Sequence, residues 1–271
     1  MLERLRRLRL RQGAVPRWWQ EIAVIGACFG PYTLIQNDAP VHATAALHRG
    51  QALLRLEDGM HIDIERAMNR WVAGVEPLAV LANYYYVALH FLVPAGILLW
   101  MYLRRRADYR SPRNALLWTT LVSLLTFWLA PTAPPRLLPG AGFIDTVARF
   151  HAIGGYESGA TERAADQFAS MPSVHIAFAL WCGVTMWRLA AHRSIGLAWL
   201  AYPVGTTLAV LVTGNHYLLD VVAGVMALGG GWLLTWASRA AGRRLDIWLG
   251  AHALTVEVES ATAERSHPVR R

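Results

Sequence analysis

The chain has 271 residues, of which 55% are hydrophobic and only 16% are charged, whereas soluble domains usually carry about a quarter charged residues. Together with a mean hydropathy of +0.28, this composition excludes a disordered chain and a disulfide-rich secreted module. Long apolar runs alternate with short Arg clusters, which is typical of a polytopic membrane protein. All 26 basic residues are Arg, and because they lie between apolar runs, membrane topology explains them better than nucleic-acid binding.

Six apolar runs are long enough, or nearly so, to cross a hydrocarbon core of about 30 Å as helices. In chain order they are Trp18–Ile35, Leu78–Leu103, Ala115–Ala130, Ala169–Leu189, Ile195–Val212 and His216–Ala237. The predicted fold is therefore all-α, a six-transmembrane-helix bundle that forms one catalytic membrane domain over residues 18–240. Residues 1–17 make a basic N-terminal segment, and we expect the polar tail at 241–271 to be disordered.

The Arg residues concentrate in four segments, namely the N-terminal segment, the loop after the second run, the turn between the fourth and fifth runs, and the tail. Because positively charged loops stay in the cytoplasm, both termini are predicted to be cytoplasmic. The complete absence of Lys favours a bacterial source and hence the inner membrane. The loops Asn37–Pro77 and Pro131–Phe168 would then face the outer, periplasmic side.

The first of these outer loops contains apolar residues at helical spacing, including Ile64, Met68 and Trp71, with polar residues such as Glu65 and Asn69 opposite. This pattern predicts a helix that lies in the membrane interface. A helix packed across the ends of the spans fits the pattern equally well. The second outer loop is rich in Pro and Gly and is predicted to be irregular.

Three polar motifs fall at the predicted outer ends of spans: Arg136 after Pro131-Thr-Ala-Pro-Pro, Met171-Pro-Ser-Val-His175, and Gly214-Asn-His216-Tyr-Leu-Leu-Asp220. Ionisable residues in such positions are costly and usually functional. Although the motifs are far apart in the sequence, their common end of the spans predicts that they form one site.

The residue types in these motifs fit phosphoryl transfer. His216 and Asp220 are four residues apart, so on a helix the carboxylate would hold one imidazole nitrogen and leave the other nucleophilic. His175 is suited to protonate a leaving oxygen. For the phosphate oxygens we expect contacts from Arg136, from Ser173 with the N–H groups at the start of the fourth span, and from Asn215.

Other interpretations of the same residues stay open. Two His and an Asp could bind zinc, but Arg136 would repel a metal ion, so we expect neither metal nor cofactor. Tyr86 and His90 are candidate substrate contacts, although an interfacial aromatic belt and a buried hydrogen bond between helices would also explain them. A non-catalytic transporter or lipid-binding protein should place its polar groups near the bilayer midplane instead.

The second and third motifs resemble two signature motifs of the type-2 phosphatidic acid phosphatase (PAP2) superfamily, over roughly Ala46–Leu234. With the Pro-rich segment before Arg136, the pattern resembles the inositolphosphotransferase branch, typified by inositol phosphorylceramide synthase. The resemblance implies six spans, a metal-independent mechanism and a phosphohistidine intermediate. By matching position it implies that His216 is the nucleophile, Asp220 orients it, and His175 is the general acid and base.

The chain also departs from the superfamily pattern. It has no Lys for the first motif, Ala209 and Val210 stand where a Ser-Arg pair usually precedes the third-motif His, and Val174 replaces the usual Gly or Leu. Fewer cations fit the transferase branch better than a simple lipid phosphate phosphatase, which is the alternative. The predicted substrate is a phospholipid or polyprenyl phosphate at the outer membrane face, with a polyol such as inositol as a possible acceptor.

Overall fold

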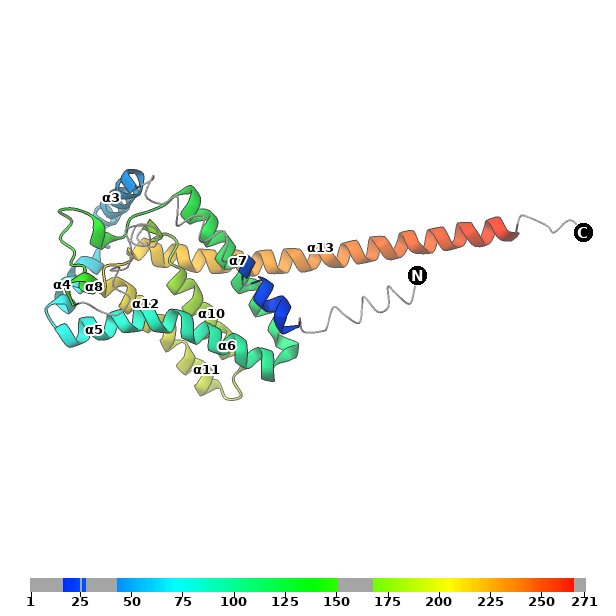
Figure 1. The fold of residues 1–271 in the computed structure, drawn as a ribbon, viewed down its shortest axis with the longest axis horizontal. Helices are drawn as coiled ribbons and strands as arrows, with labels where there is room; N and C mark the ends of the chain where they lie inside the picture. The colour runs from blue at the N-terminus through cyan, green and yellow to red at the C-terminus, as the bar shows by residue number, and fades with distance from the viewer. Residues whose placement is uncertain (1–16, 25, 28–42, 151–167, 266–271) are drawn as a thin grey trace, which may run out of the picture. The chain divides into compact units, whose positions relative to one another are not determined.

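The structure is a computed structural model that describes residues 17–24, 26–27, 43–150 and 168–265. The chain divides into two compact units, Met1–Trp232 and Leu233–Arg271. The described residues form helices joined by turns, with an isolated parallel bridge between Thr132 and Ala169. The prediction of an all-α fold is thus confirmed (Figure 1).

The helices follow one another with short connections, apart from the segment between α8 and α10. They are α3 (Ala43–Met60), α4 (Ile64–Ala73), α5 (Glu76–Tyr84), a π-helical turn (Tyr85–Leu89), α6 (His90–Arg104), α7 (Arg106–Leu129), a 3₁₀ turn (Pro135–Leu137), α8 (Thr146–Arg149), α10 (Val174–Leu189), α11 (Arg193–Trp199), α12 (Ala201–Val212) and α13 (Leu218–Arg265). Helix α13 thus continues through most of the tail for which the sequence predicted disorder.

Three stretches among the described helices are long and apolar enough to span a membrane: Glu76–Arg104, Arg193–Val212 and Leu218–Gly242. Helix α10 is apolar but has only 16 residues, and α7 starts with several charged residues. The predicted first run, Trp18–Ile35, lies largely outside the described residues. The apolar helices indicate a membrane protein, and the count of six spans stays a prediction.

Helix α4 forms where the sequence predicted a helix in the first long loop. Its Val72 is buried together with residues of α5 and α12, whereas Ile64 and Trp71 are 52% and 67% exposed. Glu65 and Asn69, which the pattern placed on the side away from the apolar residues, are completely buried. Helix α4 therefore packs across the ends of α5 and α12, and its Trp71 and Ile64 side chains remain exposed.

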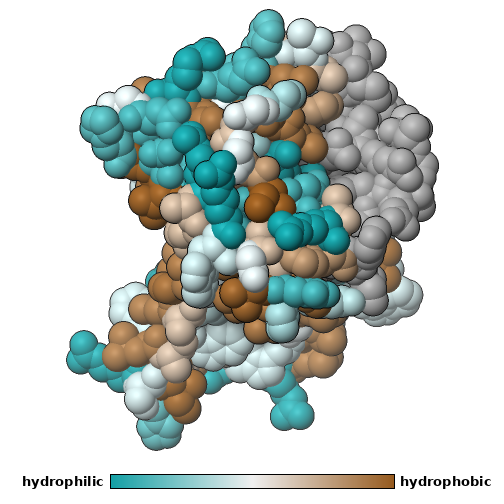
Figure 2. Space-filling model, turned by 90° about the vertical axis from the view of Figure 1, so that its left-hand side faces the viewer, coloured by the Kyte–Doolittle hydropathy of each residue, from teal (hydrophilic) through white to brown (hydrophobic). Residues whose placement is uncertain are grey.

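Helices α3, α4 and α8 lie together at one end of the first unit (Figure 1). Its surface mixes hydrophilic and hydrophobic residues (Figure 2). Exposed ion pairs join Arg66 to Asp58 at 2.9 Å and to Asp63 at 3.4 Å. Helix α3 contains no long apolar run and is not among the candidate spans.

The main core of the unit lies between α6, α7, α10 and the start of α13. Trp181 is fully buried there, beside Met101 and Tyr109, and its indole N–H donates to the Pro112 carbonyl at 2.8 Å. A Cβ added to Gly231 would lie 2.6 Å from the Ala115 carbonyl. Such close approach over small residues is how helices pack in membranes, where burial of apolar surface gives little gain.

Candidate active site

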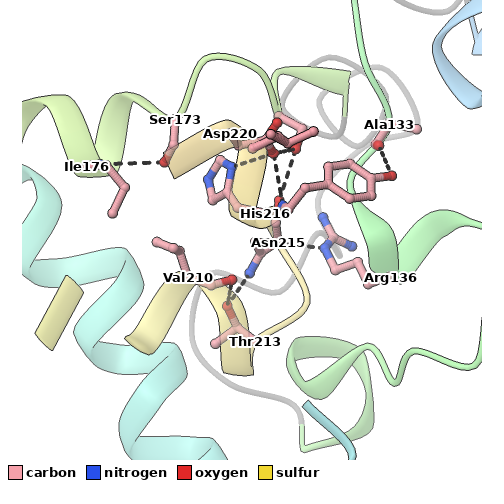
Figure 3. Close-up of polar contacts among 12 residues, drawn as sticks. Ala133, Arg136, Ser173, Ile176, Val210, Thr213, Asn215, His216 and Asp220 are labelled. Carbon is pink, nitrogen blue, oxygen red and sulfur yellow. Dashed lines mark hydrogen bonds and ion pairs between the residues drawn. The ribbon is translucent and has the colours of Figure 1, made fainter. Parts of the chain in front are cut away.

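Backbone hydrogen bonds join the three sequence motifs at the α3/α4 end of the unit. The Arg136 N–H donates to the Gly214 carbonyl at 3.0 Å, and the Ser173 N–H donates to the Asp220 carbonyl at 3.1 Å. The third motif is therefore bonded to each of the other two, and residues of all three motifs lie in one region (Figure 3).

His216 and Asp220 form a buried pair, with Nδ1 of His216 3.2 Å from Oδ2 of Asp220. The two residues are 2% and 0% exposed. Nε2 of His216 has no hydrogen-bond partner among the described residues. The predicted pair thus forms with one imidazole nitrogen held and the other available.

The pair does not, however, share a regular helix face as the spacing predicted. Helix α13 begins only at Leu218, so His216 lies in the segment before the helix and Asp220 in its first turn. Oδ2 of Asp220 also accepts from the backbone N–H of Tyr217 at 3.1 Å. An acidic side chain that bonds back to an N–H three residues earlier is one half of a capping box. The carboxylate therefore caps the helix and orients His216 at once.

A third donor to the same carboxylate oxygen was missed by the sequence analysis. The buried Ser170 hydroxyl donates to Oδ2 of Asp220 and lies 3.3 Å from the Asn215 carbonyl. Its position directly before the Met171–His175 motif is the signal that could have identified it. Ser170, Tyr217 and His216 together fix the direction of the Asp220 carboxylate.

Arg136 and Asn215 were both predicted to contact phosphate, and the structure shows that they also contact each other. Nε of Arg136 donates to Oδ1 of Asn215 at 2.7 Å, and Nη1 donates to Oδ2 of Asp145 at 2.7 Å. The Arg136 side chain is only 1% exposed. Asp145, which the sequence analysis did not single out, also caps α8 and offsets part of the Arg136 charge.

Ser173 is the N-cap of α10, and its fully buried Oγ accepts from the Ile176 N–H at 3.5 Å. Unpaired N–H groups and the helix dipole make the N-terminus of a helix favourable for anions. His175 lies in the first turn of this helix, with its ring centroid 5.5 Å from that of His216. Direct contact of Ser173 with phosphate stays a prediction.

The turn between α12 and α13 depends on Gly214 and Asn69. Gly214 has a φ of +69°, and a Cβ there would lie 3.2 Å from Nδ2 of Asn69. Asn69 donates to the carbonyls of Val212 at 2.9 Å and Ile144 at 3.0 Å, and accepts from the Ile144 N–H. Asn69 therefore connects the end of α12 to the segment that carries Asp145.

Gly224, which lies one turn after Asp220 in α13, packs tightly against the start of α10. A Cβ built on this residue would lie 2.5 Å from the Ser173 carbonyl and 3.2 Å from Cβ of Ile176. The absence of a side chain at Gly224 therefore allows the two helices that carry Asp220 and His175 to approach each other closely.

Gly224→Ala should therefore lower kcat by about 10- to 100-fold, because displacements near 1 Å at a catalytic site have effects of that size. The helical content should remain that of the wild type. Gly229→Ala and Gly230→Ala are matched controls on the same helix, since nothing lies within 4 Å of their added Cβ. Both controls should keep the wild-type kcat when turnover of the same lipid substrate is measured. Full activity in Gly224→Ala would show that this contact does not set the geometry of the site.

A buried carboxyl group from outside the predicted spans supports the start of α13. Oε1 of Glu57 accepts from the Leu219 N–H at 2.6 Å, and the buried carboxyl groups of Glu57 and Glu65 interact with each other. Burial and the neighbouring Glu65 and Asp220 raise the pKa of Glu57 from 4.5 to about 9. Burial also raises the pKa of Glu65. The pair of Glu57 and Glu65 therefore holds a proton in the folded protein at neutral pH.

Because the folded protein binds this proton more tightly than the unfolded chain does, Glu57 stabilises the fold below pH 4.5, and the effect is lost as the pH rises towards 9. We expect the thermal midpoint in detergent to fall by about 3 °C or more over this range, which corresponds to roughly 1 kcal/mol. Glu57→Gln keeps the acceptor for Leu219 and should flatten the dependence. The adjacent exposed carboxyl provides the control, Asp58→Asn, which should retain the wild-type slope. An unchanged slope in Glu57→Gln would mean that another group binds the proton.

No three His, Cys, Asp or Glu side chains in the described part of the chain are placed to hold a metal ion together. The zinc alternative would thus need ligands from residues outside that part. His216 and Asp220 instead have the pairing that favours a nucleophilic imidazole.

A family model for the PAP2 superfamily matches residues 51–234, which is more than half of the chain. The chain belongs to the PAP2 superfamily. Membership indicates a lipid phosphatase-type enzyme, in agreement with the apolar helices of a membrane protein. The match is to the superfamily as a whole and covers all three motifs. The chain matches no curated protein and no solved structure.

Proposed function

We propose that this PAP2-superfamily protein is a membrane lipid phosphotransferase or phosphatase that forms a phosphohistidine on His216. The observation that carries the proposal is the His216 ring itself. Its Nδ1 is bonded to the Asp220 carboxylate, which two further donors also orient. Its Nε2 has no partner in the described structure, and His175 lies beside the ring. This is the arrangement of a nucleophile, its orienting group and a proton donor.

In the first step Nε2 of His216 attacks the phosphorus of a lipid phosphate. The bond from phosphorus to the leaving oxygen breaks, and that oxygen takes a proton from His175. In the second step His175 accepts a proton from water or an alcohol, whose oxygen attacks the phosphorus and releases His216. Apart from the lipid substrate and the acceptor, only the two histidines change their bonds, and both return to their starting state after the second step.

The phosphoryl oxygens would be stabilised by Arg136, by the N-terminus of α10 with Ser173, and by Asn215. Stabilisation of these oxygens is most of what catalysis of phosphoryl transfer requires. Because Asp145 already pairs with Arg136, the site supplies little net positive charge. This supports transfer of phosphoinositol or another phospho-headgroup from a phospholipid, with a polyol such as inositol as acceptor. A polyprenyl phosphate is the other candidate donor.

The proposed enzyme needs neither metal nor cofactor. It lies in the bacterial inner membrane with both termini cytoplasmic, so that the site faces the periplasm. The Arg distribution supports this orientation.

The test is incubation of the purified protein with phospholipids and polyprenyl phosphates, with and without myo-inositol, followed by identification of every phosphorus-containing product. Phosphorylated inositol that appears only with inositol would establish the transferase, whereas inorganic phosphate alone would establish the phosphatase alternative. Both activities should survive EDTA. Complete loss on chelation, restored by zinc, would support the metal alternative.

A further inference from the structure

A five-residue π-turn, Tyr85–Leu89, interrupts the long helix formed by α5 and α6 beside the site. Such turns are rare and frequently occur at functional sites. Helix α12 holds this one in place from both ends. The Tyr202 hydroxyl donates to the Leu89 carbonyl at 2.9 Å, and the Tyr85 hydroxyl donates to the Tyr202 carbonyl at 3.2 Å.

The π-turn places one aromatic ring on each face of His175. The centroid of the Tyr86 ring lies 4.0 Å from that of His175, with 15° between the two ring planes. The centroid of the His90 ring also lies 4.0 Å from that of His175, with 30° between the planes. Two rings cannot stack at this distance on the same face, so the imidazole lies between them. His216, at 5.5 Å and 60°, must then face the ring edge, where the two nitrogens are.

The positions of the two outer rings depend on the π-turn. The outer rings must be roughly 8 Å apart, because each is 4.0 Å from His175 and they lie on opposite faces of it. Tyr86 lies inside the π-turn and His90 directly follows it. The backbone path of this turn therefore sets where both side chains begin.

Stacking also decides what His90 can do. Ring nitrogens donate and accept in the plane of the imidazole, and two rings stacked face to face cannot join their nitrogens by a hydrogen bond. His90 therefore contacts His175 through the face of its own ring. The Phe178 ring stacks on the other side of His90, with a centroid distance of 5.1 Å and an interplanar angle of 18°. A direct proton relay from His90 to His175 does not fit this geometry.

We propose that Tyr86 and His90 are positioning residues that hold the His175 imidazole edge-on to His216, between two rings that the π-turn positions. The proposal rests on the proposed function, in which His175 transfers the proton. Both residues then affect catalysis through His175. The sequence had instead suggested that they contact the substrate.

The test compares His90→Phe with His90→Leu, and Tyr86→Phe with Tyr86→Leu, on a phospholipid substrate. Phe keeps an aromatic face and fits beside Phe178, so both Phe variants should keep kcat within about threefold of the wild type. Both Leu variants lose the stacked face and should lower kcat by about tenfold or more, with KM within about twofold. Thermal unfolding of each variant shows whether the fold is retained.

Several results would overturn the proposal. A relay or a hydrogen bond from His90 requires its nitrogens, so a folded His90→Phe with the low kcat of His90→Leu would contradict positioning. A rise in KM at unchanged kcat would indicate substrate contact, and wild-type kcat in both Leu variants would show that the two rings have no effect. If the wild type itself formed no phosphohistidine, the proposed function would fail, whereas an active wild type without dependence on these rings would refute only this inference.

Discussion

His216→Ala should abolish turnover and, with it, any covalent phosphoprotein. Among the described residues, the His216 imidazole has one nitrogen without a partner while Asp220 holds the other, Nδ1, at 3.2 Å. Removal of a catalytic nucleophile lowers kcat by at least about 10³-fold. Rapid quenching after addition of a ³²P-labelled lipid phosphate should give an acid-labile, alkali-stable phosphoprotein in the wild type and none in the variant.

Asp220→Asn and Ser170→Ala are the companion variants. Asp220→Asn should lower kcat by roughly 10²- to 10⁴-fold and leave KM nearly unchanged, because the amide favours the wrong imidazole tautomer. Ser170→Ala removes one of three donors to the carboxylate, so its kcat should fall by only about tenfold. A phosphoprotein that persists in His216→Ala would show that another residue is the nucleophile.

The apolar pattern was sufficient to predict the helical fold. The three motifs were identified from polar residues at the ends of the apolar runs. Span-like runs of apolar residues are visible in a sequence because the bilayer requires them. The motifs could be grouped because each lies at the same predicted end of a run, and the bonds from Arg136 to Gly214 and from Ser173 to Asp220 join them in the structure.

Other residues became apparent only in three dimensions. Ser170, Asp145 and Glu57 have no distinctive spacing, and each matters through a contact with a residue at least nine positions away. Two contacts hold the start of α13 at Leu218. Glu57 accepts from the Leu219 N–H, and Asp220 accepts from the Tyr217 N–H. Spacing alone therefore predicted the His216–Asp220 pair but not the helix end that forms it.

Tyr86 and His90 illustrate a different limit. Their spacing of four residues is that of neighbours on an α-helix, and nothing in the sequence indicates that a π-turn separates them. The sequence could identify them only as polar aromatic residues near the site. The stacking distances then support an effect through His175.

His175→Ala should separate the two chemical steps by leaving group. With a lipid substrate the departing alkoxide needs a proton, so kcat should fall by about 10²- to 10⁴-fold. A p-nitrophenyl phosphodiester releases a phenolate that needs little protonation, so the variant should still form the phosphohistidine at close to the wild-type rate. Because the same imidazole must then activate the acceptor, the intermediate should accumulate. Pre-steady-state measurement of p-nitrophenolate release with substrate in excess, together with quantification of the phosphoprotein, resolves the two steps.

The burst of p-nitrophenolate should therefore equal one equivalent per enzyme in His175→Ala and be followed by slow turnover. Added imidazole or a more acidic acceptor alcohol should accelerate the slow phase, because either one replaces the missing proton transfer in the second step. His175 lies with its ring 5.5 Å from His216, close enough for one residue to serve both half-reactions through a substrate oxygen. A variant that releases the phenolate without a burst would show that His175 does not limit the second step. Phosphorylation found on His175 in the wild type would reverse the roles of the two histidines.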